Sequence, residues 1–586
     1  MTISIAAVFA PLLFTGGLTG ALFSEFAVTL AGAVIISGLV ALTITPMMSA
    51  RLLTRGGGRF QTTIDNIYEK LANWYERRVS SSLDFRPVTL ILVVVLLGLT
   101  GFMFVKTSSE LAPEEDVGAL FAMVNAPSYA TADYTNLYAT QMRDLTKDLP
   151  ELRLDFQVTG MGGQTNSAFA LWAFKDWGDR DRSQQELQED IQGRLAGVSG
   201  VEPLVFSPPS LPGAGGGLPI EMVIQSTGSV DRVYEVAEEI KERAEQTGQF
   251  IVVQNSLAYD QEEVVVTIDR DRAAALNLPI REIGNTLSLL VGDGTIAQFD
   301  RESSSYDIIM QVPEEYRDNP ERLGEFFVRS VTGDMVPLSA VVTISTDVTA
   351  STIEQFDQLN SATISALPML GVTTGTGLAE LIRITEEVMP DDFFINYSGQ
   401  SRLEIQEGNT ILLAFALALT VIYLVLAAQF ESFRDPLIIM MSVPLSIFGA
   451  MLPLFFGLST LNIYTEVGLI TLIGLITKHG ILMVEFANQQ RRDHGLDRAA
   501  AIVAAARTRL RPILMTTAAM GLGVVPLILA SGAGASARYA MGLVIFTGII
   551  IGTIFTLFVV PMFYTLIAKR ELKAETEDDR PPVSAA

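Results

Sequence analysis

The sequence predicts a fold of two classes: an α-helical polytopic membrane domain, and an α+β domain outside the bilayer. The first observation is hydropathy, since 49% of the residues are hydrophobic and the mean hydropathy is +0.37. An ordinary set of soluble domains is less apolar than this. The second observation is charge, because the formal net charge of −25 resides almost entirely in residues 106–410. The third is the regular strand and helix patterning of that acidic interval.

Apolar segments long enough to cross a bilayer account for the membrane domain. They lie at about residues 20–50, 87–105, 411–430, 436–457, 466–487, 512–532 and 537–567. A shorter apolar stretch occupies residues 1–15, as expected of a truncated helix. It has neither a charged leading region nor a small-residue cleavage site, which excludes a signal peptide.

The membrane segments also contain an internal repeat. Residues 4–53 resemble residues 519–568 without a gap, and Pro11 and Pro46 each recur 515 positions later. Chance similarity between apolar helices is the alternative, but prolines shared at one offset favour a duplicated membrane domain. A long chain precedes the second copy and none precedes the first. We therefore expect residues 1–53 to be the end of a first transmembrane repeat, with one truncated and one full helix.

Basic residues predict the orientation, because short cytoplasmic loops are rich in lysine and arginine. The basic connections contain Arg51, Arg55, Arg59, Lys70, Arg77, Arg78 and Arg86, then Arg491, Arg492, Arg498, Arg507, Arg509 and Arg511, and finally Lys569 and Arg570. The acidic interval is therefore expected on the outer side. Residues 54–86 form an amphipathic pattern, which predicts a helix on the cytoplasmic membrane surface or one packed on a partner helix. Residues 568–586 are expected to be a cytoplasmic tail.

The outer interval reads as four strand–helix–strand units, which predicts two ferredoxin-like α+β subdomains. The expected first subdomain is 106–217, and the second combines 218–261 with 346–400. Residues 262–345 are expected to be an insertion, with a strand at 263–268 and a turn at 332–334. Each unit consists of a strand, a helix and a strand, in that order. The first is 120–126, 131–149 and 154–159, and the second is 168–174, 183–196 and 202–207. The third is 220–225, 230–246 and 250–254, and the fourth is 362–367, 376–388 and 393–397. Such units also occur as rigid scaffolds, so they name no function.

Lys478 interrupts an apolar segment near its middle. A lysine at this depth costs several kcal/mol, so it pairs with a carboxylate or lines a wet path. At about 1.5 Å per residue, Glu466 and Glu485 lie roughly 18 Å and 10 Å away along the helix axis. No other spanning segment has a central Asp or Glu. A neutralised or snorkelling lysine is the simpler alternative. We favour an ion-coupling site whose acidic partner is not in this chain.

Catalytic groups are scarce. The chain has no cysteine, which excludes thiolate metal sites. Its two histidines, His479 and His494, have no convincing nucleophile with which to form a catalytic triad. No Walker phosphate-binding motif occurs. We expect no enzyme activity, no cofactor and no metal, so transport would draw on an ion gradient. The outer interval has no basic patch, and nucleic acid is not an expected partner.

Three motifs jointly resemble resistance–nodulation–division (RND) efflux transporters. They are Gln429-Phe-Glu-Ser-Phe-Arg-Asp-Pro436, Gly474-Leu-Ile-Thr-Lys-His-Gly-Ile-Leu-Met-Val-Glu-Phe-Ala-Asn488 and Arg509-Leu-Arg-Pro-Ile-Leu-Met-Thr516. The resemblance runs from residue 1 to about 570. It implies two membrane halves of six helices each. On that template the chain begins in the fifth helix and contains the whole second half. The acidic interval becomes two periplasmic porter subdomains with a docking insertion, and 411–567 becomes a five-helix bundle.

The resemblance also implies a proton relay. Lys478 matches the family's membrane lysine, whose partners are two aspartates on the fourth helix. Arg509 and Thr516 match a basic and a hydroxyl residue on the eleventh helix, and their spacing puts them on one helical face. His479 stands where many relatives have another polar residue, and no role follows for it.

The function implied is that of a multidrug-branch permease subunit in the bacterial inner membrane. It would exchange protons for hydrophobic or amphiphilic compounds, as a homotrimer with a periplasmic adaptor protein and an outer-membrane channel. This portion alone is expected to be inactive, because the relay carboxylates lie elsewhere. Two alternatives stay open: a non-transporting half-subunit for assembly or sensing, and a lipid or export accessory of the same superfamily.

Overall fold

A computed structural model describes residues 2–14, 16–52, 59–160, 163–213, 215–292, 294–317, 319–369 and 371–569. The chain forms two compact units. One comprises Met1–Ala126, Thr131–Asn255 and Phe356–Ala586, and the other comprises Pro127–Ala130 with Ser256–Gln355. Parts of the expected interfacial helix (54–58) and of the expected tail (570–586) lie outside the described residues.

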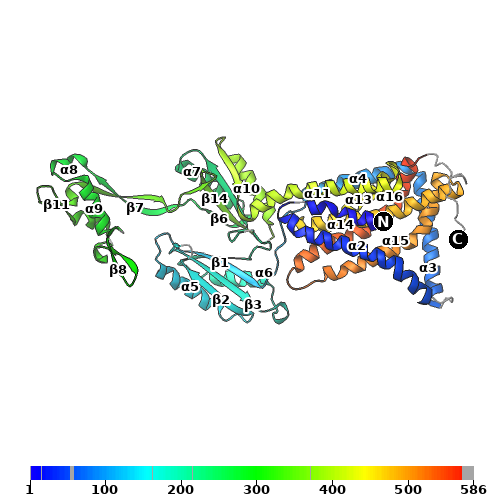
Figure 1. Ribbon diagram of the computed structural model, residues 1–586, viewed down its shortest axis with the longest axis horizontal. Helices are drawn as coiled ribbons and strands as arrows, with labels where there is room; N and C mark the ends of the chain where they lie inside the picture. Colours follow the sequence, from blue (N-terminus) through cyan, green and yellow to red (C-terminus); the bar gives the residue numbers. More distant parts are fainter. Residues whose placement is uncertain are drawn as a thin grey trace. The chain divides into compact units, whose positions relative to one another are not determined.

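The described residues contain seven spans long and apolar enough to cross a membrane, which confirms the predicted set. The helices are α2 (Gly17–Leu52), α4 (Arg86–Lys106), α11 (Gly399–Phe430), α12 (Arg434–Met440) with α13 (Ser442–Phe455), α14 (Ile463–His494), α15 (Arg498–Ile528) and α16 (Ala535–Ile567) (Figure 1). Two short helices precede them, α1 (Thr2–Val8) and η1 (Ala10–Phe14).

Two of these helices begin earlier than the sequence predicts. The expected spans start at 411 and 512, whereas α11 starts at Gly399 and α15 at Arg498. Hydropathy detects only the apolar part of a helix, and the added turns are polar or mixed. Pro512 consequently lies inside α15 rather than at its start. Packed neighbours allow a proline within a membrane helix.

The bundle core lies where α13, α14 and α16 meet. Their backbones approach closely because glycines face neighbouring side chains. A Cβ atom on Gly552 of α16 would fall on Ser446 of α13, and one on Gly449 of α13 would fall on Ile551. Small residues at helix interfaces permit this packing in membranes. The central part of α14 is almost entirely buried, which places its polar residues inside protein.

Helix α3 (Arg59–Asp84) packs on two membrane helices. The Tyr75 hydroxyl donates to the Leu557 carbonyl of α16 at 2.6 Å, and Arg507 of α15 forms an ion pair with Glu76 at 2.8 Å. The Arg511 guanidinium of α15 lies 5.3 Å from the centre of the Tyr68 ring. The expected helix therefore exists, and contacts with α15 and α16 hold it.

The first sheet has the strand order β2-β3-β1-β4, with every neighbouring pair antiparallel. Its elements are β1 (Ala119–Asn125), α5 (Ala132–Thr146), β2 (Leu152–Thr159), β3 (Ser167–Phe174), η3 (Trp177–Asp179), α6 (Gln184–Leu195) and β4 (Glu202–Phe206). Side chains of β1 and β3 alternate between buried and half-buried, so one face carries the core. Trp172 is buried there, and its indole N–H donates to the Thr146 hydroxyl at 3.1 Å.

The second sheet repeats this order as β6-β14-β5-β15. Its elements are β5 (Ile220–Ser226), α7 (Val230–Gln246), β6 (Phe250–Asn255), β13 (Glu354–Phe356), β14 (Leu359–Pro368), α10 (Thr374–Val388) and β15 (Phe393–Tyr397). Strand β5 is central and buried along nearly its whole length. The eight strands and four helices expected from the sequence are present in these two sheets, with ends shifted by a few residues.

The second compact unit has its own small core. Its strands are β7 (Tyr259–Ile268), β8 (Thr295–Arg301), β9 (Ser304–Ile309), β10 (Phe327–Arg329), β11 (Met335–Pro337) and β12 (Val342–Ala350), and its helices are α8 (Arg270–Ala275), α9 (Ile280–Leu290), η4 (Glu314–Tyr316), η5 (Pro320–Glu325) and η6 (Leu338–Ala340). The core residues are Ala273, Leu278, Ile283, Val328, Leu338 and Val341. The expected turn connects β10 to β11, where Gly333 has φ +94° and the Thr332 hydroxyl donates to Asp334 at 2.8 Å.

Candidate functional site

Helix α14 sets the position of Lys478. Its N-terminus is fixed at Asn462, whose side-chain oxygen accepts from Tyr464 N at 3.0 Å and Thr465 N at 3.1 Å. Its C-terminus ends at Gly495, in the left-handed conformation with φ +64°. Lys478 is therefore at the middle of a continuous helix of 32 residues. A helix of that length is about 48 Å long, so both ends lie far from this lysine.

Lys478 has no carboxylate within ion-pair distance in the part of the chain that the structure describes. Its side chain is half-buried, whereas the residues before and after it, Thr477 and His479, are buried. A cation held at this depth needs an anionic or wet environment, since desolvation costs several kcal/mol. That the acidic partner of Lys478 lies outside this chain stays a prediction.

Arg509 and Thr516 lie on α15. The Arg509 guanidinium stacks on the ring of Phe486 of α14, 4.6 Å from its centre, and its buried Nε has no hydrogen-bond partner among the described residues. The Thr516 hydroxyl donates within its own helix, to Pro512 O and Ile513 O, both at 3.0 Å. No hydrogen bond in the described parts joins Lys478, Arg509 and Thr516 to one another. Arg509 therefore faces α14. The ring on which it stacks, Phe486, is eight residues after Lys478, which is roughly 12 Å along the axis of α14.

His479 occupies a polar junction that the sequence did not reveal. It is fully buried, with Nδ1 3.3 Å from the Thr553 hydroxyl of α16 and Nε2 3.5 Å from the Thr517 hydroxyl of α15. The two hydroxyls are 3.2 Å apart. Three helices therefore meet in a closed triangle of polar atoms beside Lys478. The sequence showed only that His479 is a second polar residue next to the lysine. The two threonine partners of His479 lie 38 and 74 positions away in the chain, so nothing in the sequence linked them to it.

The triangle suits a neutral imidazole, which has one donor and one acceptor nitrogen. One ring nitrogen donates to the first hydroxyl, the first hydroxyl donates to the second, and the second donates to the other ring nitrogen. Every donor then has an acceptor without a net charge. Reversing the direction of the three bonds exchanges the two tautomers of His479. The hydroxyls also contact their own helix carbonyls, Ile513 O at 2.9 Å and Ile549 O at 2.6 Å, so they have an alternative acceptor.

Removing the imidazole should destabilise the bundle. We expect His479→Leu to lower the unfolding midpoint of the purified protein in detergent, because the Thr517 and Thr553 hydroxyls lose the imidazole and keep only each other and their helix carbonyls. The loss should be about 0.5–1.5 kcal/mol per hydrogen bond. His494→Leu, on the exposed end of α14, is the control and should have little effect. Adding Thr517→Val and Thr553→Val to His479→Leu should recover part of the loss, because the two hydroxyls that faced the imidazole are then absent. A triple variant less stable than His479→Leu alone would contradict the triangle.

A cavity of about 360 Å³ lies at the end of the bundle next to the sheets. Its lining includes Glu110, Pro113, Leu458, Ser459, Thr460, Ala530, Ala535, Ser536 and Tyr539. The Thr460 hydroxyl donates to Glu110 at 2.5 Å. Burial raises the pKa of Glu110 to about 7, the Thr460 bond opposes this, and the charge of Glu114 adds to it. This carboxyl group therefore exchanges its proton near neutral pH.

Comparison with known proteins places these observations in a family. Residues 1–568 match the AcrB/AcrD/AcrF family. An uncharacterized transporter of Haemophilus influenzae is 39% identical over 577 residues, which are 97% of this chain and 56% of that protein. The multidrug/solvent efflux pump membrane transporter MepB of Pseudomonas putida is 32% identical over 99% of this chain and 56% of its own length. The multidrug resistance protein MdtF of Escherichia coli is 28% identical, with 97% and 56% covered.

The chain thus spans about half the length of the curated relatives it matches. The match extends through the membrane helices, both sheets and the second unit, and it includes the three motifs that predicted the family. The chain belongs to the AcrB/AcrD/AcrF family of RND efflux transporters.

Proposed function

We propose that this chain is the C-terminal portion of a proton-driven permease subunit that exports hydrophobic or amphiphilic compounds across the bacterial inner membrane. The observation that carries the proposal is Lys478, at the middle of the buried helix α14 and without an acidic partner among the described residues. An ionisable residue kept at this depth marks an ion pathway. The names of relatives that export drugs and solvents support the substrate class.

In this proposal the Lys478 ammonium binds carboxylates supplied from outside residues 1–586. Proton uptake by those carboxylates removes the ion pair, and proton release restores it. The lysine would therefore experience two different electrostatic environments in one cycle. Because Lys478 and His479 are neighbours on α14, any shift of the lysine also acts on the contacts of His479 with α15 and α16. Arg509 and Thr516, on the face of α15 that the family uses, would line the same path. The proton gradient supplies the energy, and no cofactor is needed.

The two sheets would serve as the porter subdomains, 106–217 and 218–261 with 346–400. Their shared strand order, with a helix after the first and third strand of each, supports a ferredoxin-like fold for both. The insertion 262–345 falls in the separately packed second unit and would dock to an outer-membrane channel. The assembly would be a homotrimer with a periplasmic adaptor protein.

Efflux from living cells tests this function directly. The complete permease, built by placing the unmatched part of the Haemophilus influenzae relative before residue 1, is produced in a host without its own pumps. We expect efflux of a hydrophobic cationic dye that stops when a protonophore collapses the gradient. A permease that reaches the membrane and moves no dye or detergent-like compound would refute the proposal.

Topology gives an independent prediction, because the native chain has no cysteine. Thr332→Cys, in the turn between β10 and β11, should react with a membrane-impermeant thiol reagent in intact spheroplasts. The matched control is His494→Cys at the exposed end of α14, which should react only after the membrane is broken. The reverse labelling pattern would mean that the sheets face the cytoplasm, and efflux would lose its structural basis.

A further inference from the structure

Residues 107–118, which connect α4 to β1, form backbone hydrogen bonds with the helix bundle before the chain enters the first sheet. Glu110 N donates to Leu461 O at 3.0 Å, and Leu461 N donates to Ser108 O at 2.9 Å. Ile463 N, in the first turn of α14, donates to Leu111 O at 3.2 Å. The segment is therefore held against the α13–α14 connection. Three consecutive acidic residues follow, Glu114, Glu115 and Asp116, and the last two face different helices.

Glu115 binds the N-terminus of a membrane helix. Its side chain is buried, with 7% of the residue exposed, and its two oxygens accept from Ser536 N at 3.2 Å and Ala537 N at 2.6 Å. These N–H groups belong to the first turn of α16, which has no partners for them within the helix. A carboxylate at this end also opposes the positive end of the helix dipole. The bonds are charge-assisted and are stronger than neutral ones.

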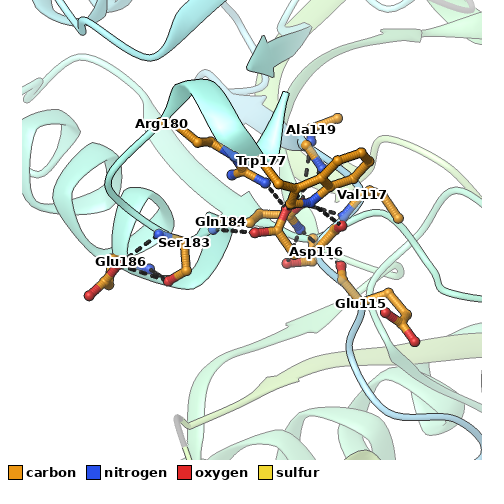
Figure 2. A network of polar contacts seen from close by, with 11 residues as sticks. Glu115, Asp116, Val117, Ala119, Trp177, Arg180, Ser183, Gln184 and Glu186 are labelled. Atoms are coloured by element: carbon orange, nitrogen blue, oxygen red, sulfur yellow. Dashed lines mark hydrogen bonds and ion pairs between the residues drawn. The ribbon is translucent and has the colours of Figure 1, made fainter. Parts of the chain in front are cut away.

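Asp116 binds the N-terminus of a helix in the sheet region (Figure 2). Its Oδ2 accepts from Gln184 N, the first residue of α6, at 3.0 Å. Its Oδ1 accepts from the indole N–H of Trp177 at 3.2 Å and forms an ion pair with Arg180. The Arg180 side chain is 2% exposed, so this cation depends on Asp116 for its charge balance.

Gln184, whose backbone binds Asp116, also forms side-chain hydrogen bonds with the first sheet. Its side-chain oxygen accepts from Val117 N at 2.9 Å and Ala119 N at 3.3 Å, at the start of β1 (Figure 2). Its amide donates to the Ser207 hydroxyl at 3.0 Å, just after β4. Displacing Asp116 must therefore displace α6 and β1 together. Trp177 adds a second link, since its ring lies beside Gly532 in the α15–α16 connection.

We propose that Glu115 and Asp116 form a joint that transmits movement of α16 to the first sheet. Each carboxylate holds the N-terminus of one helix, α16 in the membrane and α6 in the sheet region, and the two residues share one peptide bond. This role rests on the proposed function, in which the cycle of Lys478 and His479 moves α16 through Thr553. Thr553 and Ser536 are 17 residues apart on one helix, roughly 26 Å along its axis, so a shift at one is carried to the other. Glu115 and Asp116 are positioning residues, and neither contacts Lys478, Arg509 or Thr516 in the described part of the chain.

Hydrogen exchange of the purified chain in detergent tests whether the two caps act as one unit. Glu115→Gln keeps the size of the side chain and removes its charge. We expect faster amide exchange at 536–538 and also at 184–187, although the altered carboxylate contacts only the first of these segments. The backbone carbonyl of Glu115, which accepts from Gln184 Nε2 at 3.5 Å, is unchanged by the substitution. The matched control is Glu186→Gln, because Glu186 caps α6 with Ser183 and has no contact with α16 among the described residues. It should speed exchange at 184–187 alone. Faster exchange confined to 536–538 in Glu115→Gln would overturn the joint.

Transport by the complete permease provides the second readout. We expect Glu115→Gln to lower kcat for efflux about tenfold with KM unchanged, in the range of ordinary coupling between sites. Glu186→Gln should change neither. A raised KM with unchanged kcat would overturn the joint, because it would mean that the residue affects substrate binding. If the unaltered permease moves no substrate, the proposed function fails, and exchange at 184–187 alone decides whether the joint exists.

Discussion

Replacing Lys478 with methionine is expected to reduce efflux by the complete permease at least about 100-fold, the scale on which loss of a proton-transfer group acts. Methionine keeps much of the volume of lysine but removes the ammonium group. The carboxylates that face it would then be buried without a cation, and the neutral, protonated form would be favoured throughout the cycle. A relay that cannot release its protons cannot exchange them for substrate.

The measurement is substrate accumulation in a pump-deleted host, with membrane level and trimer content determined in parallel. Lys106→Met is the control, since Lys106 is exposed at the end of α4 and loses the same charge outside the bundle core. We expect Lys106→Met to export normally and Lys478→Met to assemble normally without exporting. Efflux near the level of the unaltered permease in Lys478→Met would rule out the relay assignment.

Residues 1–586 alone are expected to give no proton-driven efflux. The physical reason is the same lysine, which has no carboxylate partner among the described residues. In a drug-sensitive host the chain should leave sensitivity unchanged, although it reaches the membrane. Joining it to the unmatched part of the Haemophilus influenzae relative should restore resistance, because the proposed function places the relay carboxylates there.

The control for that restoration is the same fusion with those carboxylates replaced by the matching amides, which should be inactive again. Robust efflux from residues 1–586 that a protonophore abolishes would show that this chain contains a complete relay. The half-subunit alternative gives a different result: co-purification with a second polypeptide, and activity that requires it.

Elements with strong local patterns were predicted well. Strands β1 and β3 are short, almost continuous apolar runs, and the seven spans are long and apolar, so the signal for each lies within its own residues. The starts of α11 and α15 were wrong because their first turns are not apolar. Hydropathy measures how readily a segment enters lipid. The helical hydrogen bonds of α11 and α15 extend past the apolar segment into polar residues, which hydropathy does not detect.

The site was predictable only in part, for a similar reason. Lys478 is conspicuous because a charge in an apolar segment is a local anomaly. The partners of His479 are not, since Thr517 and Thr553 resemble the other hydroxyl residues of membrane helices until packing brings three helices together. Glu115 and Asp116 were not distinguished in the sequence from the many other acidic residues of the outer interval. Their meaning depends on where two helices begin, and those helices start 68 and more than 400 positions later.

The equal strand order of the two sheets bears on how such proteins diversify. In the first sheet a short connection, 160–166, joins the second strand to the third, whereas in the second sheet 256–358 fills the same place. A whole packed unit has thus been accommodated at a hairpin, a position where insertions leave strand pairing intact. Its size and surface can change through evolution, or by grafting from a relative, without altering the sheet that carries it. Under the proposed function, the surface that docks to a partner can therefore evolve separately from the membrane helices.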